Sequence, residues 1–83
     1  MTPLQAQMLR EIALSDFTEV NGREPDTLQD IGWVWADTVI TDAQDRGVFL
    51  SLQQAGLVVH SGGPAGYAGV TLTEAGFRAY KAL

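Results

Sequence analysis

Cysteine is absent from the 83-residue chain, and histidine occurs once. Without cysteine the chain can form neither a disulfide framework nor a thiolate metal site, and a single histidine excludes a histidine cluster. No stretch approaches the roughly 18 uninterrupted apolar residues that span a bilayer, and the first residues lack the basic and apolar segments of a secretory signal peptide. We therefore expect a cytoplasmic protein that contacts no membrane.

Basic residues are also scarce, since five Lys and Arg stand against ten Asp and Glu, for a net charge of −5. The acidic residues gather before Gly47, and no formally charged residue occurs from Gly47 through Thr73. The share of hydrophobic residues, 46%, is typical of a folded protein, and a chain this short forms one domain. The uncharged stretch is either core with a glycine-rich turn or a neutral surface that meets a partner.

The amino-terminal part begins with a helix and continues into an acidic loop. Thr2, Pro3 and Gln5 match an N-cap, a first-turn proline and a capping box. Apolar residues at three- and four-residue spacing then predict one buried helix stripe. A polar, acidic segment with turn-forming residues follows, so we expect an acidic loop at about 18–32.

Short polar residues and glycines divide the rest of the chain into brief elements. Thr41 and Gln44 match a second capping box, which predicts the start of a helix. Gly56 supplies the left-handed residue that ends this helix. Apolar runs on both sides of a glycine-rich segment predict a β-hairpin. The expected elements are a strand at 33–35, a helical turn capped by Asp37, a long helix at 42–55, strands at 57–60 and 70–72, and a last helix capped by Thr73.

No catalytic constellation is visible. Neighbouring strand residues point to opposite faces, so His60 and Ser61 cannot act as a base and its nucleophile, and we expect His60 to be an exposed residue of the hairpin. The glycine-rich segment lacks the Gly-Lys-Ser/Thr ending of a phosphate loop, and the acidic residues lack the spacing of a calcium loop. We therefore expect no catalytic residue, metal ligand, cofactor or small-molecule substrate, and hence no enzyme.

Two stretches carry a resemblance to a known family: LQQAGLV at 52–58 and, after a gap of hairpin length, VTLTEAG at 70–76. Together they resemble the L-x-x-x-G-L-V and L-T-E-x-G signature of MarR-like winged-helix domains and of small phage and prophage proteins with that fold. The resemblance covers about 33–82. It implies an α+β fold with a single winged-helix domain at 1–83, in which the helix at 42–55 enters the DNA major groove and the hairpin is the wing.

The outward side of the long helix indicates the partner. Winding the helix at about 100° per residue places Gly47, Leu50 and Gln54 on the side away from the core. This small, uncharged surface suits a protein better than base edges, unless the first helix or the acidic loop covers Leu50. We expect a non-enzymatic interaction or regulatory module that binds a protein, or a second copy of itself. The expected partner-binding residues are Arg46, Gly47, Leu50, Gln54 and Tyr67.

Other aromatic residues leave two interpretations open. Tyr67 in the wing either contacts a partner or packs on the strand beside it. Trp33 and Trp35 lie on one side of the short strand and either staple it to the core or anchor a partner near the acidic loop.

The alternative is a dimeric DNA-binding transcriptional regulator of the MarR-like type. Its DNA contacts would come from Thr41, Gln44, Arg46, Gln53 and Gln54. Duplex affinity depends mainly on Lys and Arg at phosphates. Since the long helix carries one base, Arg46, and the wing carries none, the protein partner is the first hypothesis.

Overall fold

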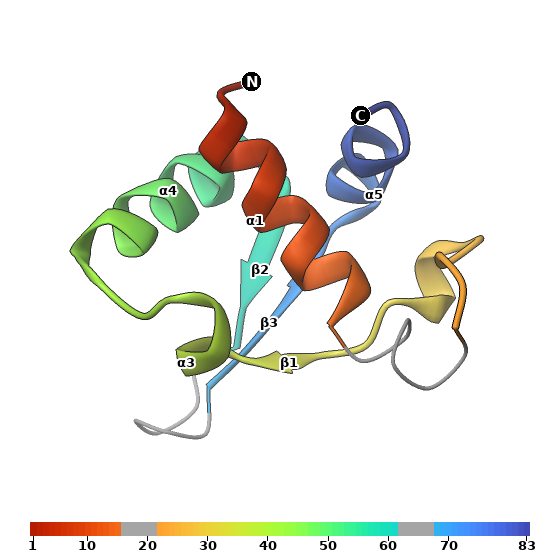
Figure 1. Cartoon of the computed structure of the whole chain (residues 1–83), viewed down its shortest axis with the longest axis horizontal. Coiled ribbons are helices and arrows are strands. Elements are labelled where there is room, and N and C mark those ends of the chain that lie inside the picture. Colours follow the sequence, from red (N-terminus) through yellow and green to blue (C-terminus); the bar gives the residue numbers. More distant parts are fainter. Residues whose placement is uncertain (16–21, 62–67) are drawn as a thin grey trace.

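The computed structural model describes residues 1–15, 22–61 and 68–83, which form an α+β fold (Figure 1). The α+β class expected from the sequence is thus confirmed. Tyr67 and part of the acidic loop lie outside the described residues. The described elements are α1 (Pro3–Leu14), the 3-10 turn η1 (Leu28–Asp30), β1 (Val34–Trp35), α3 (Ala36–Val39), α4 (Ala43–Gln54), β2 (Val58–His60), β3 (Gly69–Leu72) and α5 (Glu74–Lys81).

The strands form an antiparallel sheet in the order β1-β3-β2. The hairpin predicted from the sequence is confirmed, because β2 and β3 pair with Val59 opposite Thr71. On the other side of β3, the short strand β1 pairs with Val34 opposite Val70. β3 is therefore the central strand, and β1 and β2 are the two edges.

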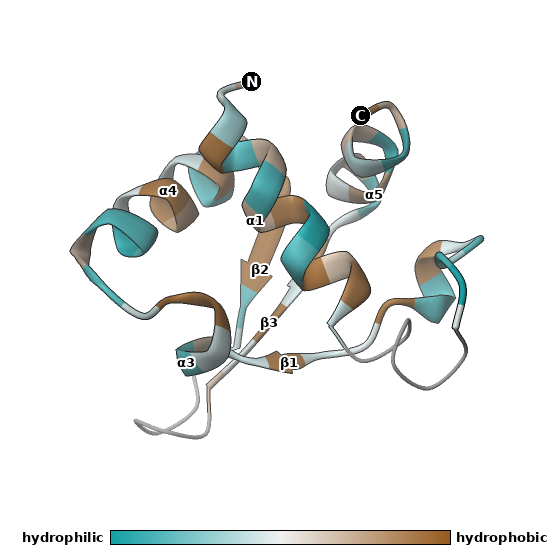
Figure 2. Ribbon diagram, viewed as in Figure 1, coloured by the Kyte–Doolittle hydropathy of each residue, from teal (hydrophilic) through white to brown (hydrophobic). Residues whose placement is uncertain are grey.

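One face of the sheet is buried beneath the helices. α1 contacts α4, α5 and β3, and Figure 1 shows it crossing the sheet between α4 and α5. Leu9 of α1, Leu52 of α4 and Val70 of β3 are fully buried where these elements meet. In Figure 2, β2 is brown over most of its length, whereas the first turn of α4 is teal. The core thus lies between the sheet and the helices, and the start of α4 faces water.

Side-chain caps explain where several elements begin and end. Thr2 Oγ1 accepts from the Gln5 amide at 3.2 Å, so the predicted cap of α1 is confirmed. Thr73 Oγ1 accepts from the Gly76 amide at 3.0 Å and caps α5 as predicted. Gly56 has φ +77°, the left-handed conformation expected after the end of α4.

Two predicted caps are wrong. α4 begins at Ala43 with Asp42 as its N-cap, and Thr41 and Gln44 do not form the capping box. The carboxylate of Asp42 accepts from the Asp45 amide at 2.8 Å, and carboxylates are strong N-caps, which shifts the helix start by one residue. α3 starts at Ala36, so Asp37 lies inside its first turn and does not cap it.

Of the two interpretations of Trp33 and Trp35, the one in which they staple the strand to the core is wrong. Their side chains are 56% and 54% exposed. Val34 between them is buried in the core. Because side chains alternate along a strand, a strand that buries Val34 turns both indoles to the opposite face of the sheet.

None of the helices in residues 1–15, 22–61 and 68–83 is long and apolar enough to cross a membrane.

Candidate functional site

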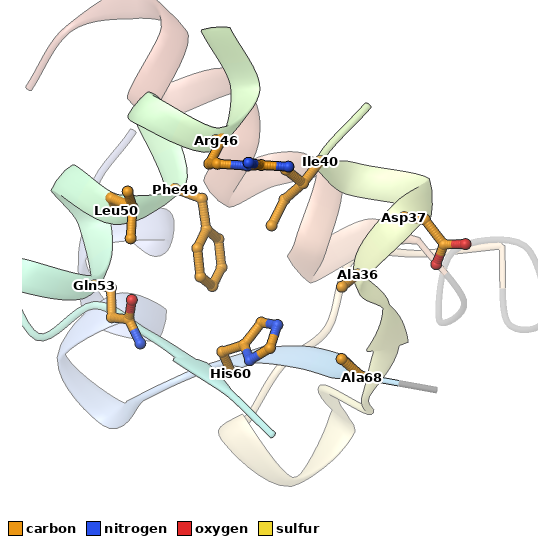
Figure 3. Close-up of a pocket in the computed structure, with 9 residues that line it drawn as sticks. All are labelled: Ala36, Asp37, Ile40, Arg46, Phe49, Leu50, Gln53, His60 and Ala68. Atoms are coloured by element: carbon orange, nitrogen blue, oxygen red, sulfur yellow. The ribbon is translucent and has the colours of Figure 1, made fainter. Parts of the chain in front are cut away.

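A hollow of about 440 Å³ opens between α3, α4 and the end of β2, and we call it the α4 groove. Its floor is Phe49, whose side chain is only 3% exposed. The Phe49 ring meets the His60 ring edge to face, with the centroids 6.0 Å apart. Figure 3 shows Phe49 reaching toward His60 between α4 and Ile40. The lining residues are Ala36, Asp37, Ile40, Arg46, Phe49, Leu50, Gln53, His60 and Ala68.

Polar groups stand around this apolar floor. Arg46 and Gln53 reach the groove from α4, and His60 reaches it from β2 (Figure 3). Among the described residues, the guanidinium group of Arg46 forms no hydrogen bond or ion pair. Its guanidinium can therefore donate to a carboxylate or carbonyl of a bound molecule. The groove can hold an apolar side chain while its rim hydrogen-bonds to polar atoms beside it.

The outward side of α4 continues the groove, and we call it the α4 surface. It consists of Arg46, Gly47, Leu50, Gln53 and Gln54, of which Arg46, Leu50 and Gln53 also line the groove. All five are exposed. Leu50 is the large apolar side chain among them and is 48% exposed. The alternative in which α1 or the acidic loop covers Leu50 is therefore wrong for the part of the chain that the structure describes. Gly47 has no atom within 4 Å of the place that a Cβ would take, so α4 offers a flat, open patch there.

Two carboxylates hold the amino-terminal end of α4. Asp45 accepts from the Thr41 amide at 3.0 Å and from the Thr41 hydroxyl at 2.7 Å. These hydrogen bonds, the hydroxyl's first, lower the pKa of the Asp45 carboxyl from its usual 3.8. The Asp42 carboxylate accepts from the Asp45 amide. Negative side chains therefore occupy the positive end of the helix dipole. A phosphate approaching this end would meet two carboxylates.

The structure brings together some of the predicted site residues and separates others. Arg46, Leu50 and Gln53 meet at the α4 groove. Gln44 lies apart from them, in a hollow between α4 and α1, and the Thr41 hydroxyl is held by Asp45. Tyr67 lies outside the described residues.

Two groove residues were missed from the sequence as site residues. One of them is Phe49, most of whose surface lies in the core. His60 was expected to be an exposed hairpin residue, and it is exposed, yet its ring also forms the wall opposite Phe49. Strand alternation placed His60 on the helix-facing side with Val58, a signal that could have joined it to α4.

Within the described ranges, no three His, Asp or Glu side chains come together in a way that could hold a metal ion. Neither protein-family models nor curated proteins nor solved structures gave a match to the chain. The functional assignment therefore depends on the α4 groove and the α4 surface themselves.

Proposed function

We propose that this chain is a non-enzymatic interaction module of winged-helix type that binds a protein partner through the α4 surface. Apart from the 3-10 turn η1, the described elements run helix, short strand, short helix, longer helix, two strands and helix, which is the order expected for a winged-helix domain. In that fold α4 takes the place of the recognition helix and β2 and β3 belong to the wing. Since fold alone does not define a partner, the partner is argued from the chemistry of α4.

The observation that carries the proposal is the exposed, uncharged patch around Leu50 beside an apolar groove. A partner that covers Leu50 removes its side chain from water, and an apolar side chain of the partner fits over Phe49. Arg46 at the rim would pair with an acceptor on the same partner segment. The expected partner is thus a protein segment with an apolar residue next to a carboxylate or carbonyl group.

Electrostatics favours a protein over duplex DNA at this surface. Asp42 and Asp45 occupy the start of α4, and Arg46 is its one base. A duplex offers a dense row of phosphates, and each contact that lacks a Lys or Arg loses part of the counterion-release free energy. A protein segment carries no such dense row of charges and does not depend on this term.

A paired capture experiment tests the proposal. The chain is immobilised and exposed to an extract of its source cells as wild type, as Leu50→Asp and as Leu83→Asp. Leu83 is the matched control, because it is 46% exposed, against 48% for Leu50, and lies at the far terminus. We expect a protein that wild type and Leu83→Asp retain at equal levels and that Leu50→Asp loses. Equal retention by all three folded chains, or no retained protein, would contradict the proposal.

DNA binding is the second candidate function, and the element order favours it. Arg46, Gln53 and Gln54 are exposed on α4 and could meet a duplex. Under this alternative, Arg46→Ala lowers duplex affinity and flattens its dependence on salt concentration. Leu50→Asp would then act through added charge and not through a lost apolar contact.

A further inference from the structure

The face of the sheet that points away from the helices carries a second apolar patch. Val34, Val58, Val70 and Leu72 are buried on the helix side. Because side chains alternate along a strand, the residues next to these buried ones on each strand point outward. We call this the outer sheet face; it consists of Trp33, Trp35, Val59, Ser61, Gly69 and Thr71.

This face exposes more aromatic surface than any other part of the described chain. Trp33 and Trp35 are more than half exposed, and Val59, on the opposite edge, is 40% exposed. Trp33 lies over Gly69, where its Cε3 atom is 3.3 Å from the place that a Cβ would take. A hollow of about 210 Å³ opens there between the two indoles and Ser61.

The two hydroxyl groups of the face form hydrogen bonds within the chain. Ser61 Oγ accepts from the Gly69 amide at 2.7 Å, and the Thr71 hydroxyl donates to the Gly32 carbonyl at 3.0 Å. These hydroxyl groups therefore have less need of water or of a polar ligand. The face presents itself to a partner as an apolar surface with a shallow hollow.

The charge distribution makes the outer sheet face the place where a second copy of this chain meets the least repulsion. Each copy carries a net charge of −5, so two copies repel each other wherever their acidic surfaces meet. The strands carry no formally charged residue. The outer sheet face is thus a surface on which two copies can meet without placing carboxylates against one another.

The exposed area is also large enough to matter for a dimer. An aromatic side chain that becomes buried removes about 150 to 250 Å² from water. Two copies bring four indoles, each about half exposed, and these supply about 300 to 500 Å². A stable dimer buries roughly 1,200 to 2,000 Å² in total, so the indoles form its apolar centre and their neighbours complete it.

We propose that two copies of the chain associate face to face through the outer sheet face, burying Trp33, Trp35 and Val59. This surface is separate from the α4 surface, so the dimer leaves α4 open to its own partner. The two proposals stand or fall independently.

The first test uses the full wild-type chain without any variant. Its mass is measured by sedimentation equilibrium from about 1 μM to about 1 mM chain, together with the wavelength of its tryptophan emission. Both tryptophans of the chain lie on the outer sheet face, so the emission reports on this face alone. We expect the mass to rise from 8.9 kDa toward twice that value and the emission to shift to shorter wavelength over the same concentrations.

The second test compares two substitutions that make the same charge change. Val59→Lys puts a lysine on the outer sheet face, and Leu50→Lys puts one on α4. Both lower the net negative charge by one, so general repulsion falls equally in the two variants. We expect Val59→Lys to weaken association at least about tenfold, because two lysines would have to be buried in the dimer, and Leu50→Lys to leave it within about twofold of wild type.

Several results would overturn this proposal. One is a sedimentation mass that stays at the monomer value up to the highest concentration. Another is a dimer that forms without a shift of the tryptophan emission. A Leu50→Lys chain that dissociates while Val59→Lys does not would also overturn it. If Val59→Lys fails to fold by circular dichroism, the wild-type measurement still decides the matter.

Discussion

Two helical glycines show how one residue type takes opposite roles in this chain. Gly76 lies in the first turn of α5, and a Cβ there would collide with the Leu57 carbonyl oxygen and lie 2.8 Å from the carbonyl carbon. The Thr73 amide donates to that same carbonyl at 3.1 Å, which holds the Leu57 backbone in place. Gly47 of α4 has open space instead. Only the first glycine is required by packing.

We predict that Gly76→Ala destabilises the fold by about 2 to 3 kcal/mol, because α5 must move away from Leu57. Gly47→Ala should stabilise it by about 0.5 to 1 kcal/mol, because alanine loses less backbone entropy in a helix. Urea unfolding followed by circular dichroism measures both free energies. Equal effects of the two substitutions would contradict the close approach of α5 to Leu57.

Tyr80 is a second residue with a defined energetic role. Its side chain is buried, and its hydroxyl has no hydrogen-bond partner in the described part of the chain. Burial, and secondarily the charge of Glu24, raise the pKa of Tyr80 from 10.0, while Arg10 opposes the shift. The folded state therefore favours the neutral phenol, and the stability that this preference contributes is present below pH 10 and lost as the pH rises above it.

We predict that Tyr80→Phe raises the free energy of unfolding by about 1 kcal/mol at pH 7, because an unsatisfied buried hydroxyl is removed. The variant should also lose less stability than wild type between pH 9 and about pH 11. Thermal unfolding at both pH values measures the two effects. A variant less stable than wild type at pH 7 would show that the hydroxyl has a partner, such as an ordered water.

At the scale of an element, the start of α4 depends on carboxylates. The lowered pKa of Asp45 means that the folded state prefers the charged form. Its contribution to stability is present above about pH 3.8, the usual value, and is lost as the pH falls below it. The Thr41 amide and hydroxyl would then lose a charged acceptor.

We predict that Asp45→Asn lowers the melting temperature at pH 7 and reduces its fall between pH 6 and pH 3. Asp37→Asn is the control, since the Asp37 carboxylate makes no hydrogen bond or ion pair in the described part of the chain. Melting curves of the three chains at both pH values give the comparison. An Asp45→Asn chain that loses as much on acidification as wild type would contradict the role given to this carboxylate.

Elements with local signals were predictable from the sequence. The caps at Thr2 and Thr73 each join a side chain to an amide three residues further along the chain. The helix end at Gly56 depends on the left-handed conformation of that one residue. Both kinds of signal can therefore be recognised from a few neighbouring residues. Helix winding likewise predicted that Gly47, Leu50 and Gln54 would be exposed, as they are. At α4, two adjacent residues could act as the cap, and the carboxylate of Asp42 took the place expected for Thr41.

Features that join separate elements were not predictable in this way. The α4 groove needs Phe49 from one helix and His60 from a strand that follows a turn, and only the packed fold brings them together. The exposure of Trp33 and Trp35 depends on which face of the sheet the helices cover. The sequence placed both indoles on one side of the strand, but it could not decide which side that was.

At the scale of the whole molecule, two surfaces carry little or no charge although the chain as a whole is negative. The α4 surface carries one charged residue, Arg46, and the outer sheet face carries none. In a chain with a net charge of −5, these are the places where apolar contact is least opposed by repulsion. We therefore propose a protein partner for the α4 surface and a second copy of the chain for the outer sheet face.

The most direct test of the account is the binding of the wild-type chain to a mixed-sequence DNA duplex at about 20 to 50 mM salt, repeated at about 200 mM salt. Non-specific duplex binding is mainly electrostatic, so a DNA-binding domain shows it at low salt even when its target sequence is unknown. The account predicts no detectable binding at either salt concentration. Binding that weakens tenfold or more between them, and that Arg46→Ala reduces, would contradict the protein-binding assignment of the α4 surface.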